Sequence, residues 1–315
     1  LVWAAAASGW IAQLRPSWRV VAAGILLVLL LTPAIVFVRD GMRFYKMAGE
    51  SIWDAAEAAT RERPLLLVNL PMRITPRSRF YPLGFEGFTP LPMRVTAEGL
   101  VYVHTGFPDA AEAVAFGIVA GDDPPGYTYQ LFARPAGWEE LAAAVRQTRA
   151  VYLTRYEPDR IHLVEAGGPP SPGRGGAGGE VLARFGDRVT LLDAACTCDE
   201  TGQVHLTAHW RVEAHVERGA TVFAHLLGPD GALIAQADGY PLLGMLPFWL
   251  WKPGEVVRDV RHFDTPRPGE YSVALGVWDL ASGARLPATA ADGSPWTEQA
   301  VRVGPCACTS TGSTR

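Results

Sequence analysis

The sequence predicts a membrane helix followed by a small α/β (α+β) domain and a C-terminal all-β immunoglobulin-like sandwich. Three observations lead to this fold class. Residues 20–38 form a long stretch without charge. Residues 45–166 alternate between apolar, strand-like runs and amphipathic, helix-like runs, which is the pattern of a layered α and β domain. Residues 181–304 change to a period of two with frequent turn signals, which is typical of a β-sandwich.

Composition limits the classes of function. The chain has 315 residues, a formal net charge of -4 and a pI near 6.0. A nucleic-acid-binding protein usually presents a basic face, so we expect no nucleic-acid partner. Hydrophobic residues make up 49% of the chain, which is enough for a core, and the length fits about two domains.

The uncharged stretch at 20–38 is long enough to cross a bilayer. As a helix it rises roughly 28 Å, close to the thickness of the hydrocarbon layer. Arg19 and Arg39 bracket it, and Trp18 and Tyr45 suit the interfacial aromatic belt. A signal peptide has a shorter apolar run followed by a cleavage site, and a buried soluble helix has a polar face. We therefore expect a membrane span, with the lipid bilayer as a partner.

Residues 1–44 are expected to be the end of a membrane region. Residues 1–13 are apolar but too short to cross a bilayer, and we interpret them as the end of a preceding helix. Because the chain begins with Leu1 and not Met, we expect the C-terminal piece of a longer polytopic protein; the alternative is a processed chain. Charge does not decide the orientation, because basic residues lie on both sides of the span. They are Arg15, Arg19, Arg39, Arg43 and Lys46.

The small α/β domain is expected at 45–166. A helix should begin after Ser51, because Ser51 and Asp54 resemble a capping box. Pro64 ends that helix and opens an apolar run at 64–71, which is the pattern of a strand buried on both faces. The pattern further predicts a strand at 99–106, a helix at 107–119, a strand at 127–133, a helix at 137–149 and a two-stranded hairpin at 150–166.

A basic loop lies between the first two predicted strands of this domain. Close to a membrane surface, its arginines could hold an anionic lipid head group. The alternative, which we favour, is a solvated or lipid-facing basic loop, because no Gly-rich phosphate loop accompanies it. His104 has no partner at ligand spacing. The arginines are Arg73, Arg77, Arg79 and Arg94.

Residues 167–180 are rich in Gly and Pro and are predicted to be a flexible linker between the domains. The sandwich follows at 181–304, and residues 305–315 are expected to be a disordered tail. Strands of the sandwich are predicted at 188–199, 203–214, 255–266 and 298–304, with hairpins at 220–239 and 269–287.

The histidines do not predict a metal site. His205 and His209 share one face of the strand expected at 203–214. Four residues along a strand separate two Cα atoms by roughly 13 Å, which is too far for one zinc ion. We therefore interpret both as solvent-facing. His215, His225 and His262 form no obvious cluster, so we expect neither a metal nor another cofactor.

The four cysteines form two C-x-C pairs, Cys196 with Cys198 and Cys306 with Cys308. Within a pair the Cα atoms of a strand lie about 6.6–6.8 Å apart, at the far edge of disulfide reach. Bonds between the two pairs are easier if their strands are neighbours, and would indicate an oxidising, extracytoplasmic location. The alternatives are free thiols or a zinc site of four thiolates, although structural zinc usually selects a wider spacing.

Two tryptophans stand beside a Pro-Gly turn. Exposed aromatic rings on a sandwich can stack on sugar rings, which makes Trp249 and Trp251 candidates for glycan binding. The alternative, which we favour, is that both pack in the core or at an edge, because Trp is usually largely buried.

Two motifs carry a resemblance to a known family: "WKPGE" at 251–255 and "PGEYSVALGVWDLASGARLP" at 268–287. They resemble a module at the C-terminal ends of large bacterial membrane proteins of the dolichyl-phosphate-mannose protein mannosyltransferase type, which are polytopic GT-C glycosyltransferases. The resemblance implies that this chain is the last span and the outer domains of such an enzyme, at a bacterial cell membrane. It also implies that the missing part transfers a sugar from a polyprenyl-phosphate donor. The family's catalytic carboxylates lie in an early outer loop that has no match here, so no catalytic residue is assigned.

Three functions follow from these observations. The first hypothesis is a non-catalytic, extracytoplasmic C-terminal part of a membrane glycosyltransferase that uses a polyprenyl-phosphate sugar. The second is a membrane-anchored sandwich module that binds glycan or a partner protein. The third is an independent enzyme in the α/β domain, which we place last because the sequence shows no nucleophile elbow, phosphate loop or metal cluster.

Overall fold

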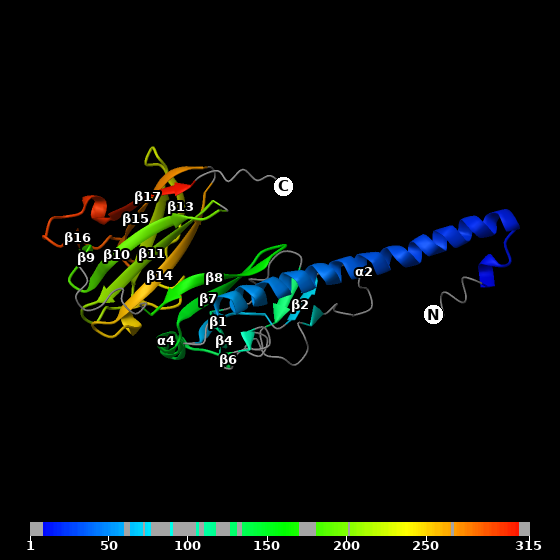
Figure 1. Ribbon diagram of the computed structural model, residues 1–315, viewed down its shortest axis with the longest axis horizontal. Helices are drawn as coiled ribbons and strands as arrows, with labels where there is room; N and C mark the ends of the chain where they lie inside the picture. The colour runs from blue at the N-terminus through cyan, green and yellow to red at the C-terminus, as the bar shows by residue number, and fades with distance from the viewer. Residues whose placement is uncertain are drawn as a thin grey trace.

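The computed structural model shows one long helix that projects from a mostly β-sheet body (Figure 1). The body contains a ten-stranded sheet, a four-stranded sheet and a small three-stranded sheet. The structure describes residues 9–59, 64–71, 73–76, 89–90, 105–106, 110–117, 127–130, 134–169, 181–200, 202–265 and 268–308.

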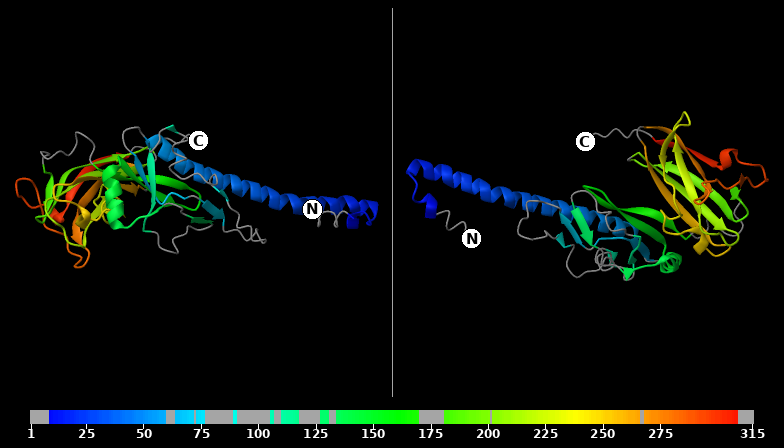
Figure 2. Two further views of the ribbon diagram at one scale, coloured as in Figure 1. Left: turned by 90° about the horizontal axis from the view of Figure 1, so that it is seen from below. Right: turned by 180° about the vertical axis from the view of Figure 1, so that it is seen from behind.

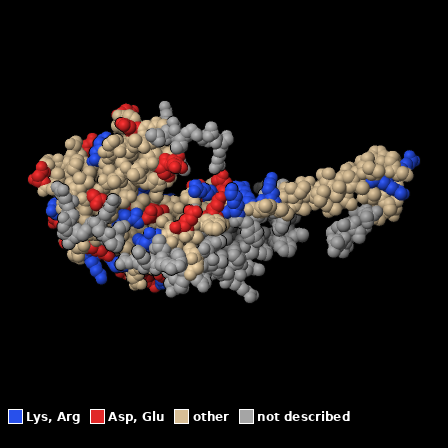
Figure 3. Space-filling model, in the orientation of Figure 1, with Lys and Arg blue, Asp and Glu red and all other residues tan. Residues whose placement is uncertain are grey.

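The projecting helix is α2 (Pro16–Ala58). Its first part, Pro16–Val36, has a mean hydropathy of 2.4 and is not buried in the body, so it is long and apolar enough to cross a membrane. Two further views show this part leaving the body (Figure 2). A space-filling view shows it as an apolar rod with basic side chains where it meets the body (Figure 3).

The helix start predicted at Ser51 is wrong, because α2 runs through that position without a break. Extending an existing helix adds one hydrogen bond for each residue fixed, whereas a new helix must first be nucleated. The last part of α2 packs on the body through Met47 and Ala55, which are fully buried. A continuous helix therefore joins the apolar segment to the body.

The part of the body next to α2, residues 64–168, is called the α/β part. Its strand β1 (Leu65–Val68) is parallel to β4 (Ala111–Ala115) and to β7 (Ala150–Tyr156). Leu65 and Leu67 face the core beneath α2, whereas Leu66 and Val68 face α4 (Trp138–Gln147) on the other side. The strand predicted at 64–71 is thus confirmed as a strand buried on both faces.

The helix predicted at 107–119 is wrong, because residues 111–115 form strand β4. The segment "AEAVA" is rich in helix-forming alanines, and local propensity favours a helix. In the folded protein it adds a parallel strand to β1 and buries Ala111, Ala113 and Val114. Backbone pairing with a buried strand outweighs the local preference.

Apart from one strand, the other predicted elements of the α/β part agree with the structure where it describes them. The predicted hairpin is β7 and β8 (Ile161–Gly168), and α4 lies where a helix was expected. Of the strand predicted at 127–133, residues 127–130 form β5. The strand predicted at 99–106 is described only at 105–106, where it is wrong, because Thr105 is helical and Gly106 lies in no strand. The remaining strands here are β2 (Arg73–Pro76), β3 (Thr89–Pro90) and β6 (Arg134–Pro135).

The linker predicted at 167–180 begins too early. Gly167 and Gly168 belong to β8 and pair with Asp259 and Arg258 of β14 (Val256–Asp264). A Cβ atom at Gly167 would lie 1.9 Å from the carbonyl oxygen of Arg258, and the φ angle of Gly167 is +127°. Only glycine fits such a close backbone approach in this conformation. The two glycines therefore join the strands into one ten-stranded sheet, and residues 170–180 lie outside the described residues.

The rest of the body, residues 181–308, is called the β region. It holds the remaining strands of the ten-stranded sheet and the four-stranded sheet in the order β13-β12-β15-β17. Buried side chains of both sheets, such as Trp210 and Val273, belong to one core. Its strands are β9 (Ala183–Phe185), β10 (Val189–Cys198), β11 (Gln203–Val212), β12 (Ala220–Leu227), β13 (Leu233–Gln236), β14, β15 (Gly269–Asp279), β16 (Ala288–Thr289) and β17 (Val301–Cys308).

These strands match the predicted strands of the sandwich closely, but the tail predicted at 305–315 begins too early. Residues 305–308 continue β17, where Cys306 and Cys308 are buried. They stay ordered because they pair with the start of β15 and are bonded to β10. Residues 309–315 lie outside the described residues.

Candidate functional site

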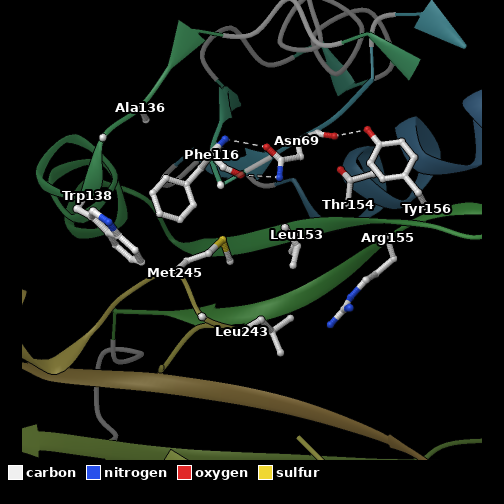
Figure 4. A pocket seen from close by; sticks show the side chains of 13 residues that line it. Asn69, Phe116, Ala136, Trp138, Leu153, Thr154, Arg155, Tyr156, Leu243 and Met245 are labelled. Carbon is white, nitrogen blue, oxygen red and sulfur yellow. Dashed lines mark hydrogen bonds between the residues drawn. The ribbon is translucent and has the colours of Figure 1, made fainter. Parts of the chain in front are cut away.

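A cavity of about 760 Å³ lies at the carboxyl ends of the parallel strands of the α/β part (Figure 4). Asn69 follows β1, Phe116 and Gly117 follow β4, and Leu153 to Tyr156 end β7. Open parallel sheets bind ligands outside the carboxyl ends of their strands. The volume is in the range of small-molecule sites. The last wall comes from Leu243, Gly244 and Met245 of the β region.

Asn69 holds the ends of β1 and β4 together. Its side chain accepts a hydrogen bond from the backbone N–H of Phe116 at 2.8 Å and donates one to the carbonyl oxygen of Phe116 at 2.9 Å. The φ angle of Asn69 is +62°, a left-handed conformation that Asn tolerates better than most residues. The hydroxyl of Tyr156 donates to the carbonyl oxygen of Asn69. This part of the cavity is therefore fixed by its own hydrogen bonds.

An aromatic cluster, defined as Phe116, Trp138, Tyr240 and Trp249, lies along the cavity and beside it. The ring of Trp138 is 4.7 Å from that of Phe116, 5.9 Å from that of Trp249 and 6.3 Å from that of Tyr240. Trp138 is the first residue of α4 and stays 39% exposed. The cluster therefore joins the α/β part to the β region and leaves the side chain of Trp138 partly exposed at the cavity.

Of the two tryptophans predicted to bind glycan, the structure leaves only Trp249 at a surface. Trp249 is half-buried against Trp138 and Tyr240, with the guanidinium of Arg218 5.6 Å from its ring. Trp251 is 4% exposed and its indole N–H donates to the carbonyl oxygen of Leu246. Trp251 therefore packs in the core, as the favoured interpretation expected, and it is lost as a glycan-binding candidate because its polar atom is satisfied there.

Sequence reasoning missed Trp138 and Tyr240, which are 102 residues apart by number (240 − 138) and meet only in the fold. The one signal for Trp138 was its place at the start of an amphipathic helix. Of the four predicted basic residues, Arg73 lies in β2, and nothing is described of its side chain. Arg77, Arg79 and Arg94 lie outside the described residues.

The cysteines form two disulfides, Cys196–Cys306 and Cys198–Cys308, and none is free. The predicted pairing between the two C-x-C motifs is confirmed, and the zinc and free-thiol alternatives are wrong. The expected reason for the pairing is not correct. β10 belongs to the ten-stranded sheet and β17 to the four-stranded sheet, so the bonds connect the two sheets and not neighbouring strands of one. Disulfides are typical of oxidising, extracytoplasmic compartments.

The histidines also differ from the prediction. His209 is 3% exposed, and its Nδ1 lies 2.7 Å from a carboxylate oxygen of Asp193, so it does not face solvent. His209 lies beside the junction of the two parts. It is the register partner of Arg258 in β14, and Arg258 in turn pairs with β8. His205 is a register partner of His262, with their Nδ1 atoms 2.9 Å apart. Burial lowers the pKa of His262. In the described part of the chain, no three His, Cys, Asp or Glu side chains are arranged to hold a metal ion.

No protein-family model matches this chain. A search of curated proteins also gives no significant match. Its function therefore has to be argued from the cavity, the disulfides and the apolar helix.

Proposed function

We propose that this chain is a membrane-anchored, extracytoplasmic binding protein that holds a glycan in the cavity beside Trp138. The observation that carries the proposal is that Trp138, 39% exposed, lines a cavity whose other side is polar. The apolar faces of sugar rings stack on aromatic rings, while their hydroxyls need hydrogen-bond partners. The aromatic cluster offers the first kind of surface and supports its orientation with Phe116 and Trp249.

The polar side of the cavity suits hydroxyl groups. Thr154 lines the cavity, is 5% exposed, and its hydroxyl oxygen has no hydrogen-bond partner in the structure. Buried polar atoms normally have a partner, and a missing partner costs free energy. Arg155 adds an exposed guanidinium with donors in a fixed fork. A ligand rich in hydroxyls would supply partners to both.

The location and the fold of the β region belong to the same proposal. The apolar part of α2 would cross a bacterial cell membrane, and the two disulfides support an extracytoplasmic body. We infer an immunoglobulin-like sandwich from two sheets that share one core around Trp210.

A second candidate function is supported by the position of the cavity near the membrane. Arg43 of α2 donates a hydrogen bond to the carbonyl oxygen of Pro158 at 3.0 Å, and Pro158 lies two residues after Tyr156 of the cavity. Arg43 lies roughly 10 Å of helix beyond Val36, where the apolar segment ends. A sugar carried on a polyprenyl phosphate would thus be within reach. This favours the non-catalytic part of a membrane glycosyltransferase.

The motif at 251–255 makes contacts that stabilise the fold; it is one of the two motifs that carry the family resemblance. Glu255 accepts hydrogen bonds from Arg146 of α4 at 2.7 and 3.1 Å, and Arg146 also donates to the carbonyl oxygen of Leu250. The motif therefore attaches α4, and with it Trp138, to the β region. The motif adds no catalytic residue.

Glycan binding by the full chain in lipid nanodiscs tests the proposal. We expect Trp138→Ala to weaken binding of the glycan that the wild-type chain binds about three- to tenfold, because one stacking surface is lost. Trp296→Ala is the matched control, since Trp296 is half-buried outside the cavity and should leave binding unchanged. Equal binding by wild type and Trp138→Ala would overturn the proposal. Tighter binding of a polyprenyl-phosphate sugar than of the free sugar would favour the second candidate.

A further inference from the structure

A second, polar cleft of about 450 Å³ lies at the junction of the α/β part and the β region. It is lined by β8 on one side and by β11 and β14 on the other. Its centre is occupied by His205 of β11 and His262 of β14, whose rings are perpendicular with centroids 4.9 Å apart. This cleft is separate from the cavity that contains Trp138, because the two share no lining residue.

A chain of three hydrogen bonds passes through the two imidazole rings. The Nε2 atom of His205 lies 2.8 Å from a carboxylate oxygen of Asp199. The two Nδ1 atoms lie 2.9 Å apart, and the Nε2 atom of His262 lies 2.6 Å from the carbonyl oxygen of Glu165. The chain thus runs from the turn after β10, through β11 and β14, to β8.

The number of hydrogens decides the charge of this pair. A carboxylate and a carbonyl oxygen only accept, so both Nε2 atoms must carry hydrogen. Two neutral rings bring two hydrogens for three links, and their bare Nδ1 atoms then face each other. A third hydrogen completes the chain and gives the pair one positive charge. A fourth would break the central link and place two positive charges side by side.

We propose that His205 and His262 share a single proton between their Nδ1 atoms, and that this proton is a pH-sensitive tie between the α/β part and the β region. The position of the histidine pair matters because it lies where β8 and β14 meet. These two strands pair at only two positions, Gly167 with Asp259 and Gly168 with Arg258. The link from His262 to Glu165 adds to these two backbone pairings and to the ion pair between Arg258 and Glu165.

The tie is strongest in a middle range of pH. As the pH rises, the shared proton leaves, one link of the chain breaks, and two lone pairs oppose each other. As the pH falls, the pair takes up a second proton only at low pH. The reason is that burial and the neighbouring His205 lower the pKa of His262.

Both acidic and basic side chains surround the two histidines. Asp199 and Glu165 favour the single positive charge, and Glu165 is itself paired with Arg258. The charged and titratable groups that face the pair come from the β7–β8 hairpin, from the turn after β10 and from β14. They are Tyr152, Arg155, Arg160, His162, Glu165, Asp199, Arg258 and Asp264.

Nitrogen-15 spectra of the histidine rings in the full chain, held in nanodiscs, test the shared proton directly. We expect Nε2 of both rings to stay protonated while the two Nδ1 signals move together in one titration step. The ring signals of His215, which is exposed and does not line the cleft, are the internal control. Two unlinked single-site curves for His205 and His262 would overturn the proposal. A change of these signals on adding a chelator would also overturn it, because a metal ion would then hold the pair.

Hydrogen exchange tests the tie. We expect exchange at the amides of Gly167 and Asp259, measured relative to that of Val273 in the four-stranded sheet, to rise about fivefold when the shared proton is lost. His205→Asn places an amide N–H near the ring Nδ1, so it donates to His262 without titrating. This variant should lose the alkaline rise, whereas His215→Asn should keep it. The same rise in His205→Asn as in wild type would overturn the proposal.

Discussion

The α/β part and the β region are stabilised in different ways. On its α2 side, the α/β part has a core of small residues, mostly alanines around Leu65, Leu67 and Leu70. Its other face shares one core with the β region. The β region instead buries large side chains such as Trp210 and Phe248, and both disulfides lie within it. The comparison teaches that the β region is held by its own core and covalent bonds, whereas the α/β part depends on its junction with the β region.

The largest expected effect comes from removing the disulfides. Each bond closes a loop with a sequence separation of 110, and the two loops have nearly the same ends. In the chain-entropy view, one bond already removes most of the freedom of that loop. We expect Cys198→Ser with Cys308→Ser to cost about 2 kcal/mol of unfolding free energy, and replacement of all four cysteines about 7 kcal/mol.

Urea unfolding of the full chain, followed by tryptophan fluorescence, measures both losses. The specific expectation is that removing one disulfide costs much less than half of what removing both costs. If each bond alone were worth half of the total, the two crosslinks would act independently and the entropic explanation would be incorrect.

The second effect concerns a buried ion pair. Arg261 and Asp259 are both almost fully buried; the guanidinium Nε donates to the carboxylate at 2.8 Å, and the other carboxylate oxygen accepts from the N–H of Leu242. Arg261→Ala leaves a buried, unpaired charge, so we expect a loss of about 3–5 kcal/mol. The combination Asp259→Asn with Arg261→Met keeps an acceptor for Leu242 without charge and should cost clearly less. Thermal unfolding compares the two, and an equal cost would show that charge is not the cause.

The third effect tests the dependence of the α/β part on its junction. Gly167→Ala forces a Cβ atom onto the carbonyl oxygen of Arg258 in a left-handed conformation, for an expected cost of about 1–3 kcal/mol. Hydrogen exchange should increase in β1 and β7 while the disulfide-bonded sheets stay protected. Gly269→Ala is the control, because its φ is not positive and its nearest contact would be 3.7 Å. Uniform loss of protection in both parts would contradict the comparison.

The smallest effect is a pH dependence. The pKa of His262 is lowered in the folded state by burial, whereas in the unfolded chain it returns to about 6.5. The unfolded state therefore binds a proton at His262 before the folded pair accepts its second proton, so the unfolding free energy should fall as the pH falls below about 6.5. In His262→Gln this slope should be smaller, as measured by urea titrations between pH 7 and pH 5. An unchanged slope would assign the acid sensitivity to other groups.

Elements with a strong local pattern were predictable. The apolar segment of α2, the buried strand β1, the amphipathic α4 and the alternating β11 each carry their own periodicity. β4 was not predictable, because "AEAVA" has the composition of a helix and becomes a strand only beside β1. In the candidate site, Trp249 was found from its position beside a turn, whereas Trp138 carries only its place at the start of an amphipathic helix and Tyr240 carries no local signal.

By itself, the sequence determined the uncharged span and most of the strands of the β region. These follow from local chemistry: the absence of charge and a period of two. For the cysteines it favoured bonds between the two C-x-C pairs but left a zinc site and free thiols open. Only the tertiary structure decided that Gly167 joins the two parts into one sheet, that the disulfides connect different sheets, and that His205 meets His262. The physical reason is that such contacts depend on the pairing of strands far apart in the chain, and no periodicity along the sequence encodes which strands become neighbours.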